Sequence, residues 1–479
     1  MSEARTRASW SGQLAFVLAA AASAIGLGNL WRFPYLAAQY GGGTFIVVYL
    51  CLVVTLGFTL MLSEIAIGRK TQQSQLTAYS RLHRGWGFIG LLGTVVPVLI
   101  VPYYCVIGGW VLKYFTAYCQ MAFCGAAPMG AEAADSGAFF NAFVSSNFAP
   151  FGYGSLFVLA CAAVIVMGVK NGIEKSNLVL MPALFVLAIA ISIYVVCLPG
   201  MGDGLKYYLV PSMDALSVNG AFSFAQLGKT ILGAMGQMFY SLSLAMGIMI
   251  TYGSYMRKSD SIERCVRRIE IFDTLIAVIA GLMIIPVVYM FAVKTGTPVK
   301  EAMNAGPGLM FITLPKVFAT LGAAGAWVGL AFFALVIFAA LTSAISLYEA
   351  CVASVCDLLQ ITRKAATFFT GTLVLFLATF SALGYGAWAD VTVCGQQVLD
   401  FFDFITNSVL MPIVAAATCI FIGWVLNPRT IEDEVTAEGN PFRARVLYRF
   451  MVKYFAPLFV TAILVSEVCR YFKIGGWSI

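Results

Sequence analysis

Apolar stretches long enough to cross a membrane recur along the whole chain, and they constrain its fold more than any other feature. A membrane-spanning helix needs about 20 predominantly apolar residues to cross a hydrocarbon core of roughly 30 Å. Only 11% of the 479 residues are charged, whereas charged residues make up about 25% of a soluble domain. We therefore predict an all-α polytopic membrane protein with one integral domain, residues 1–479. The eleven predicted spans are residues 12–38, 44–67, 88–120, 153–168, 177–198, 226–256, 266–293, 323–356, 366–386, 397–425 and 447–471.

The basic residues divide unevenly between the segments that connect these spans. When alternate segments are assigned to the two sides, one side collects 20 Lys and Arg residues and the other collects 6. Cytoplasmic segments carry the excess of positive charge, so the N-terminus is predicted in the cytoplasm. The odd number of spans then places the C-terminus outside. No cleavable signal peptide is predicted, because the polar segment 1–13 leads directly into a full span.

The first span is interrupted at the stretch ASAIGLGNLWRFPY, residues 22–35. Gly26 and Gly28 weaken the helix there, and Pro34 removes a backbone donor and clashes with a preceding carbonyl. A broken helix at membrane depth is tolerated where the freed backbone groups line a polar cavity. The new helix N-terminus suits a carboxylate, while freed carbonyls and the Asn29 side chain suit a hard cation such as Na⁺. Taken alone, the stretch also fits a glycine packing face with a proline kink.

A second interruption lies in the predicted span 226–256, where Ser241, Ser243 and Gly247 stand among apolar residues. This span opens a second group of five, as the first break lies in the first span of the first group. Two interrupted helices at matching positions of two halves indicate a transporter site between inverted repeats. We therefore predict a 5+5 inverted-repeat transporter fold with broken helices 1 and 6, whose repeats and additional helix are residues 12–198, 226–425 and 447–471.

Four ionisable residues at membrane depth are interpreted in two ways. On translocon scales such a group costs about 2.5–3.5 kcal/mol at the membrane centre. Lys113 and Lys229 are interpreted as interfacial residues whose amines reach the membrane surface. Arg32 and Asp273 lie beside broken or polar sequence and are therefore candidates for function.

Two later spans also carry adjacent polar side chains. The hydroxyls of Thr342 and Ser343 fit either an oxygen cage around a cation or ordinary bonds to carbonyls of the preceding turn. Asp400 and Asp403 are three residues apart, so they share one helix face.

Composition and motifs argue against other classes of protein. The single histidine, His83, lies in a basic connecting segment, and no metal-spaced cluster, nucleotide loop or activated nucleophile is found in the sequence, so an enzyme is not expected. A channel is disfavoured, since channels line their pores with rings of like groups, usually from symmetric subunits. Most of the 12 cysteines lie in apolar runs and are interpreted as buried apolar residues, with a Cys119–Cys124 disulfide as the less favoured alternative. No nucleic-acid partner is indicated, and no oligomeric state is predicted.

The order of the motifs resembles that of the neurotransmitter:sodium symporters. These motifs are GLGNLWRFPY, YGGGTF, the PYY of the third span, GQMFYSLSL, LTSAIS and LDFFDF, and the match covers about residues 7–470. The chain is most similar to the bacterial amino-acid transporters of that family, including those for leucine and for several hydrophobic amino acids. The resemblance implies a broken-helix transporter that couples sodium to a small amino-acid substrate.

The resemblance also implies particular binding residues. The substrate would contact Ala24, Leu27, Gly28, Ile100, Tyr104, Tyr240, Ser241, Ser243, Met246, Ser343 and Leu347. A first sodium would be held by Ala24, Asn29, Ser241 and Asp273, and a second by Ala22, Ile25, Ala339, Thr342 and Ser343.

Gating residues follow from the same resemblance. Arg32 and Asp403 would form an outer charge pair above the substrate, with Tyr240 as an aromatic lid. Arg7 and Asp357 would form the inner gate, with Trp10 as an N-terminal anchor. Gly172 and Pro182 would let the inner end of the fifth helix unwind and hydrate the second sodium; an ordinary helix start followed by a kink is the alternative.

Departures from the family pattern and the make-up of the pocket narrow the predicted function to a chloride-independent transporter of neutral apolar substrates. Asp273 stands where many members have asparagine, so the chain supplies a negative charge that animal members take from chloride. Tyr240 stands where many relatives have phenylalanine, and Ala245 where a glycine often sits. No charged side chain is available to the pocket, which favours a neutral apolar substrate, and the flexible Met246 favours several sizes, aromatics included.

The predicted function is therefore chloride-independent, sodium-coupled import of neutral hydrophobic or aromatic L-amino acids by alternating access. The alternative is a transporter-like amino-acid sensor that binds without pumping. The eleven-span layout and short tails indicate the plasma membrane of a bacterium, with the lipid bilayer and the amino acid as partners.

Overall fold

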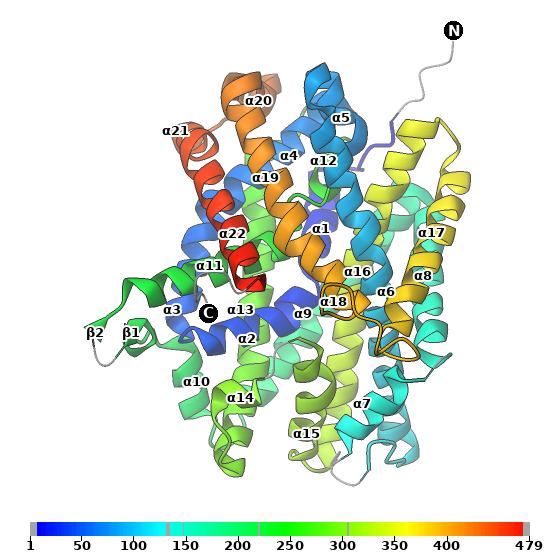
Figure 1. Ribbon diagram of the computed structural model, residues 1–479, viewed down its shortest axis with the longest axis vertical. Helices are drawn as coiled ribbons and strands as arrows, with labels where there is room; N and C mark the ends of the chain where they lie inside the picture. Colours follow the sequence, from blue (N-terminus) through cyan, green and yellow to red (C-terminus); the bar gives the residue numbers. More distant parts are fainter. Residues whose placement is uncertain (1–6, 131–134, 147, 219–220, 304–305, 473–479) are drawn as a thin grey trace.

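The computed structural model describes residues 7–130, 135–146, 148–218, 221–303 and 306–472 (Figure 1). Within these residues, nine helices are long and apolar enough to cross a membrane, and one bent pair makes a tenth span. Apart from one short antiparallel strand pair, regular structure in this part of the chain is helical. The prediction of an all-α polytopic membrane protein is confirmed.

The helices of the predicted spans follow the expected order. They are α1 (Gln13–Ala24) with α2 (Phe33–Gln39), α3 (Gly43–Leu52) with α4 (Phe58–Thr71), α6 (Gly87–Cys124), α8 (Ala149–Val166), α9 (Lys175–Val196), α11 (Phe224–Ser241) with α12 (Ile248–Gly253), α13 (Ile262–Thr295), α16 (Ala323–Leu359), α17 (Arg363–Leu383), α18 (Val398–Asp403) with α19 (Met411–Ile420), and α21 (Arg445–Phe450) with α22 (Ala456–Tyr471). Segments of π-helix lie at Gly28–Arg32, Val53–Gly57, Val169–Glu174, Leu309–Thr313, Phe404–Leu410, Phe421–Leu426 and Met451–Phe455.

Shorter elements occupy the connections. They are α5 (Gln75–Leu82), α7 (Ser136–Val144), α10 (Gly202–Leu209), α14 (Val299–Ala302), α15 (Leu314–Ala319), α20 (Pro428–Val435), 3₁₀ turns at Arg84–Trp86, Asp214–Leu216 and Ala437–Gly439, and strands β1 (Ser217–Val218) and β2 (Ala221–Phe222). The strands pair antiparallel, with Ser217 opposite Phe222. This hairpin and α10 were not predicted from the sequence.

The two predicted breaks are present. Helices α1 and α2 with the π-helical segment between them bend by 54°. The sixth predicted span, 226–256, is divided between α11 and the six-residue α12, so neither part forms a continuous apolar span. The fifth predicted span begins too late at residue 177, because the polar segment Val169–Glu174 already forms a π-helix that continues into α9.

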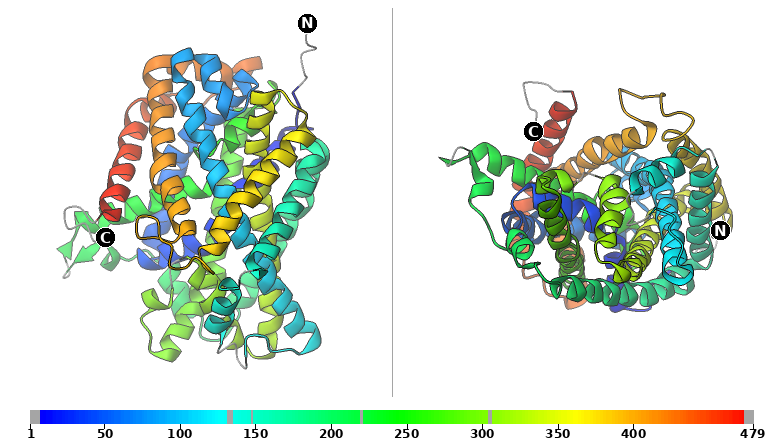
Figure 2. Two further views of the ribbon diagram at one scale, coloured as in Figure 1. Left: turned by 45° about the vertical axis from the view of Figure 1, so that its right-hand side comes forward. Right: turned by 90° about the horizontal axis from the view of Figure 1, so that it is seen from below.

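The broken helices lie in the middle of the bundle. Figure 1 shows α1 and α12 centrally, with α6, α8, α16 and α17 on one side and α3, α11 and α22 on the other. The view from below in Figure 2 shows the long helices standing around this centre. The second half of α1, residues Ala19–Ala24, is buried, so the freed backbone at its end is enclosed by protein rather than lipid, as the membrane requires.

Candidate functional site

The two breaks face each other across the centre of the bundle. The hydroxyl of Ser243, in the break of the sixth span, donates to the Ser23 carbonyl at 3.1 Å. Ser243 and Ala245 both have positive φ, 53° and 59°, a conformation that residues with a side chain adopt rarely and at an energetic cost. The Ala245 N–H is held by the carboxylate of buried Glu64 at 2.7 Å. The surrounding structure therefore fixes the break in one conformation.

Carbonyl oxygens freed at the end of α1 gather around Ser343 of α16. The Ser343 hydroxyl lies 3.5, 3.1 and 3.1 Å from the carbonyl oxygens of Ala22, Ser23 and Ile25. We call these four residues the Ser343 cluster. One hydroxyl has one proton, so it cannot satisfy three carbonyls at once, and the surplus of oxygen lone pairs suits a hard cation.

The neighbouring hydroxyl behaves differently. Thr342 donates to the Phe338 and Ala339 carbonyls at 3.0 and 3.1 Å, which is the back-bonding alternative that its sequence context allows. Thr342 and Ala339 lie one turn or less from Ser343 on the same helix and are both buried. The Ser23 carbonyl is the member of the Ser343 cluster that the sequence did not predict.

A carboxylate without a cationic partner lies beside the first break. Asp273 of α13 is fully buried, and it accepts hydrogen bonds from Asn29 (2.8 Å), Ser241 (2.8 Å) and Tyr49 (3.1 Å). We call these four residues the Asp273 cluster. The ion pairs of the described chain do not include Asp273. A buried charge without a partner is very costly, so this carboxylate fits a bound cation.

Tyr49 and Gln237 complete the polar surroundings and were missed in the sequence analysis. Tyr49 reaches Asp273 from α3, across 224 positions of sequence. Gln237 is buried and donates to the Gly28 carbonyl at 3.1 Å, while its own side-chain oxygen has no hydrogen-bond partner. Neither residue stands in a local pattern that marks it as polar lining.

A cavity between the two clusters brings together most of the predicted substrate residues. Its walls include Ala24, Gly28, Ile100, Tyr104, Tyr240, Ser243, Met246, Ser343 and Leu347, with Ser23, Gly26, Asn29 and Ile248 in addition. None of these side chains carries a formal charge. The remaining predicted residues, Leu27 and Ser241, lie outside the cavity wall, although the Leu27 N–H donates to the Tyr104 hydroxyl at 3.3 Å.

This cavity depends on two glycines, because a side chain at either position would fill part of its space. A methyl group added to Gly26 would lie 2.7 Å from the Ser343 hydroxyl oxygen and 3.0 Å from that of Tyr104. A methyl group added to Gly28 would collide with the ring of Tyr240. Tyr240 therefore lies directly against the first break.

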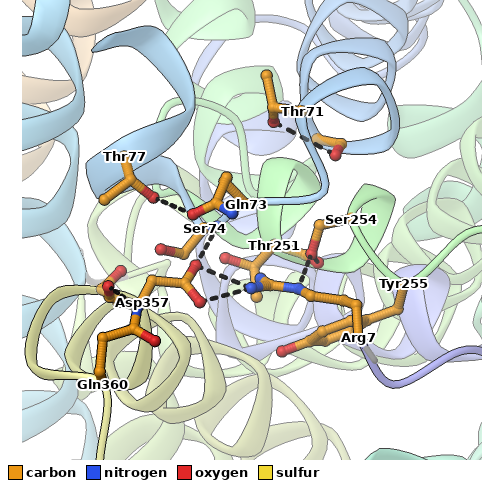
Figure 3. A network of polar contacts seen from close by, with 12 residues as sticks. Arg7, Thr71, Gln73, Ser74, Thr77, Thr251, Ser254, Tyr255, Asp357 and Gln360 are labelled. Carbon is orange, nitrogen blue, oxygen red and sulfur yellow. Dashed lines mark hydrogen bonds and ion pairs between the residues drawn. The ribbon is translucent and has the colours of Figure 1, made fainter. Parts of the chain in front are cut away.

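The N-terminal side of the molecule is closed by a polar network (Figure 3). The Arg7 guanidinium bonds both oxygens of Asp357 at 2.6 and 2.8 Å, and it donates to the Ser254 hydroxyl at 3.1 Å. The Ser74 N–H donates to the same carboxylate at 2.6 Å. Fully buried Trp10 donates to the Tyr252 carbonyl at 3.0 Å. Arg7 and Asp357, predicted as the inner gate, are thus in contact with each other, and Trp10 is held by the backbone of Tyr252.

Arg32 and Asp403, predicted as the outer gate, form no ion pair within the described residues of this structure, and their role as a gate stays a prediction. Arg32 instead lies over the Tyr240 ring, with 5.7 Å between the guanidinium carbon and the ring centroid. Asp403 accepts hydrogen bonds from Tyr103 at 3.1 Å and Asn407 at 2.6 Å. These neutral donors stabilise the carboxylate where it is, so Arg32 and Asp403 remain apart.

The predicted hinge of the fifth helix lies in irregular helix. Gly172 is part of the π-helical segment Val169–Glu174, and Pro182 lies inside α9. Glu174 in that segment accepts a hydrogen bond from the Ser11 N–H at 3.0 Å. The start of the fifth helix is therefore bonded to the same N-terminal segment that carries Arg7 and Trp10.

Comparison with known proteins agrees with this architecture. The model of the sodium:neurotransmitter symporter family matches residues 7–127 and 154–477. A sodium-dependent transporter of Haemophilus influenzae is 30% identical, over 97% of this chain and 99% of that protein, and the YhdH transporter of Bacillus subtilis is 31% identical, over 96% and 97%. The crystal structure of MhsT in complex with L-phenylalanine superposes with a TM-score of 0.83 at 34% identity, covering 96% of this chain and 100% of that one.

The broken helices, the two oxygen clusters and these matches define a membrane transporter that uses sodium, not an enzyme. The chain belongs to the sodium:neurotransmitter symporter family. Its fold is that of the MhsT transporter.

Proposed function

We propose that this protein is a symporter that uses the sodium gradient to import neutral apolar or aromatic L-amino acids. The observation that carries the proposal is Asp273, a fully buried carboxylate held by three neutral donors and by no cationic side chain of the described chain. A cation bound beside it removes the cost of the isolated charge. Binding of sodium is then a condition for a stable loaded site.

The cavity supports an amino-acid substrate. At the break in the first span, the Gly28 N–H and the Tyr104 hydroxyl would bind a carboxylate, joined by the Leu27 N–H that now donates to Tyr104. A helix N-terminus favours an anion. The wall also carries the apolar side chains of Ile100, Met246 and Leu347, and its polar side chains, such as Ser243 and Ser343, are uncharged. A charged side chain would find no partner there. The MhsT structure was solved with L-phenylalanine, an amino acid of the class proposed here.

Two sodium ions are proposed. The first would be held by the Ala24 carbonyl, Asn29, Ser241 and Asp273. The second would be held by the carbonyls of Ala22, Ile25 and Ala339 and the hydroxyls of Thr342 and Ser343. Oxygen-only ligand sets of this kind suit hard cations, and the Ser343 cluster already gathers three carbonyls within 3.5 Å of one hydroxyl.

Transport is proposed to be independent of chloride. Asp273 carries a fixed negative charge beside the first sodium, so no second anion is needed to balance that ion. Replacement of chloride by gluconate is therefore expected to leave sodium-dependent binding unchanged, and a loss of binding in gluconate would contradict this part of the proposal.

The proposed cycle is alternating access. The Arg7–Asp357 contact closes the N-terminal side while Arg32 and Asp403 are apart. Substrate and sodium would bind from the open side, Tyr240 and the Arg32–Asp403 pair would then close over them, and unwinding near Gly172 would open the opposite path. Each ligand moves this equilibrium only as far as its affinity differs between the states.

We propose the plasma membrane as the site of action, with the N-terminus in the cytoplasm and the C-terminus outside. The asymmetry of Lys and Arg between the two sets of connecting segments supports this orientation. The last residues, 473–479, lie outside the described residues.

Equilibrium binding tests the substrate class. Labelled phenylalanine, leucine, alanine, lysine and glutamate would be bound to purified protein in sodium chloride, sodium gluconate and potassium chloride. Saturable binding of the apolar members in both sodium salts, with little in potassium, is expected. Sodium-dependent binding of lysine or glutamate would contradict the assignment of the cavity.

A further inference from the structure

A second cavity lies away from the central site, against the end of α2. Its volume is about 840 Å³, and its walls come from α10, the segment that follows α10, the end of α2, the end of α13 and the start of α14. The first broken span thus lines the central cavity with residues around its break, such as Ala24 and Gly28, and lines this second cavity with Ala38 of α2.

The charge on this cavity is positive. Lys206 and Lys300 are exposed on its wall together with Asp203, so one positive charge remains unbalanced. The ion pairs of the described residues include neither lysine. The rings of Tyr207 and Tyr289 lie 5.4 Å apart beside them. Two lysine amines on the same wall as two aromatic rings suit a phosphate or carboxylate that carries an apolar part.

The depth of the cavity follows from its contact with the second span. Pro211 on the cavity wall pairs with Gly42, directly before the span Gly43–Thr71 begins. The Thr44 hydroxyl donates to the Ser212 carbonyl at 2.9 Å. The cavity therefore lies where a span enters the hydrocarbon core, which is the level of the lipid phosphates.

Exposed apolar side chains continue along the chain from the cavity wall. Met213 is 66% exposed and Phe224 82% exposed, and Leu209, Val210 and Phe222 are also exposed. Figures 1 and 2 show the β1–β2 hairpin and the segment around it projecting sideways from the helical body. Exposed apolar residues beside basic ones at this depth match an acyl chain and its headgroup.

We propose that this cavity binds an anionic phospholipid, with its phosphate between Lys206 and Lys300 and its acyl chains along the exposed apolar segment. The proposal goes beyond amino-acid transport and does not depend on which substrate is carried.

Such a lipid would act on the gate side of the broken helix. The Tyr207 hydroxyl donates to the Ala38 carbonyl at 2.7 Å, and the Gln39 amide donates to the Lys300 carbonyl at 3.0 Å. A phosphate that joins Lys206 to Lys300 would therefore clamp α10 and α14 together over the end of α2. That helix begins one residue after Arg32.

The test compares two charge-matched double variants. K206Q/K300Q removes the proposed ligands, while K294Q/K316Q removes two lysines that do not line the cavity. Delipidated protein would be titrated with phosphatidylglycerol, and bound lipid counted by native mass spectrometry and followed by thermal stability. Inorganic phosphate and water-soluble glycerophosphoglycerol would be titrated in parallel.

We expect phosphatidylglycerol to stabilise the wild type and K294Q/K316Q. The affinity of K206Q/K300Q for this lipid should be at least about tenfold lower. Equal affinity in both variants would overturn the proposal. Full stabilisation by inorganic phosphate or glycerophosphoglycerol would also overturn it, because the site would then take a free anion. Sodium-dependent phenylalanine binding, measured on each variant, shows that the central site is folded and reports separately on the proposed function.

Discussion

Asp273 shows how one side chain gives this site its chemistry. Its three neutral donors come from three different spans, through Asn29, Ser241 and Tyr49. Hydrogen bonds to an ionised carboxylate stabilise it, but they leave its charge in place. A cation supplied from solution can balance that charge at membrane depth.

Asp273→Asn is therefore expected to weaken sodium binding. Loss of the charge should reduce the apparent sodium affinity at least tenfold, equivalent to about 1.4 kcal/mol. The measurement is the sodium dependence of thermal stability in purified protein. Asp390→Asn, which removes an exposed acid in the segment between α17 and α18, serves as the control and should titrate like the wild type. An unchanged sodium titration in the Asp273 variant would remove Asp273 from the sodium site.

Gly26→Ala is expected to abolish high-affinity substrate binding. The added methyl group would lie 2.7 Å from the Ser343 oxygen and 3.0 Å from the Tyr104 oxygen, closer than carbon and oxygen pack without displacement. Labelled phenylalanine should bind at least tenfold more weakly in sodium. Gly12→Ala adds the same group where no atom lies within 4 Å, and it should bind normally. Equal affinity of the two variants would mean that Gly26 does not border the bound substrate.

Sequence patterns predicted the members of the site that stand in motifs. Asn29, Ser241 and Asp273 do meet in the structure, as do Ala22, Ile25 and Ser343. Tyr49 could not be predicted, because an aromatic residue in an apolar span has no local mark of polar contact. The separation of Arg32 from Asp403 depends on donors such as Tyr103, whose choice of partner only the packed structure reveals.

At the scale of the helical elements, the contact between Arg7 and Asp357 is largely buried. Arg7 and Asp357, at the two ends of the N-terminal contact, are 17% and 13% exposed. Removal of one partner of a largely buried pair leaves the other charge unpaired, which is more destabilising than loss of a surface pair.

Asp357→Asn is expected to loosen the N-terminal side. Hydrogen exchange over Gln13–Ala24 should become about tenfold faster or more, because the segment from Arg7 to Trp10 would detach more often. Asp433→Asn removes an exposed acid in α20 that forms no ion pair within the described residues, and it should leave this exchange unchanged. If both variants exchange alike, the Arg7–Asp357 contact does not hold the closed state.

The environment of Glu432 in α20 leads us to predict that the local stability of this connecting helix depends on pH. Burial by itself raises the pKa of this carboxyl, but hydrogen bonds from Arg449 and Arg445 outweigh it, so the pKa lies below its ordinary value. A lowered pKa contributes stability above the unfolded value of about 4.3, and that stability is lost as the pH falls through the folded pKa. Hydrogen exchange of Pro428–Val435 should therefore accelerate below about pH 4 in the wild type.

Glu432→Gln provides the comparison for this effect. The variant should exchange faster at neutral pH and lose the additional acceleration in acid. Glu438→Gln, in the exposed turn that follows, should retain the wild-type profile. Identical pH profiles for the wild type and Glu432→Gln would show that the contacts with Arg445 and Arg449 do not anchor α20.

The order and breaks of the spans could be predicted, since glycines, a proline and polar residues interrupt otherwise apolar helices. The early start of the fifth helix could not be predicted, because residues 169–174 are too polar to resemble a span. Their π-helix depends on contacts such as the bond from the Ser11 N–H to Glu174. The β1–β2 hairpin is two residues long on each side, too short for any alternating pattern.

The molecule as a whole is asymmetric across its centre. One side is closed by Arg7 and Asp357, and on the other Arg32 stands apart from Asp403. One inward charge at 100 mV provides about 2.3 kcal/mol, and a tenfold sodium gradient adds about 1.4 kcal/mol. Even one sodium ion per cycle is therefore enough to accumulate a zwitterion many-fold.

Gradient-driven uptake tests this account most directly. Labelled phenylalanine would be supplied to proteoliposomes with an inward sodium gradient, with that gradient collapsed by an ionophore, and with potassium in place of sodium. We predict accumulation above the equilibrium level with the gradient alone, and none for lysine or glutamate. Specific, sodium-dependent binding of phenylalanine without accumulation would contradict symport and identify a sensor.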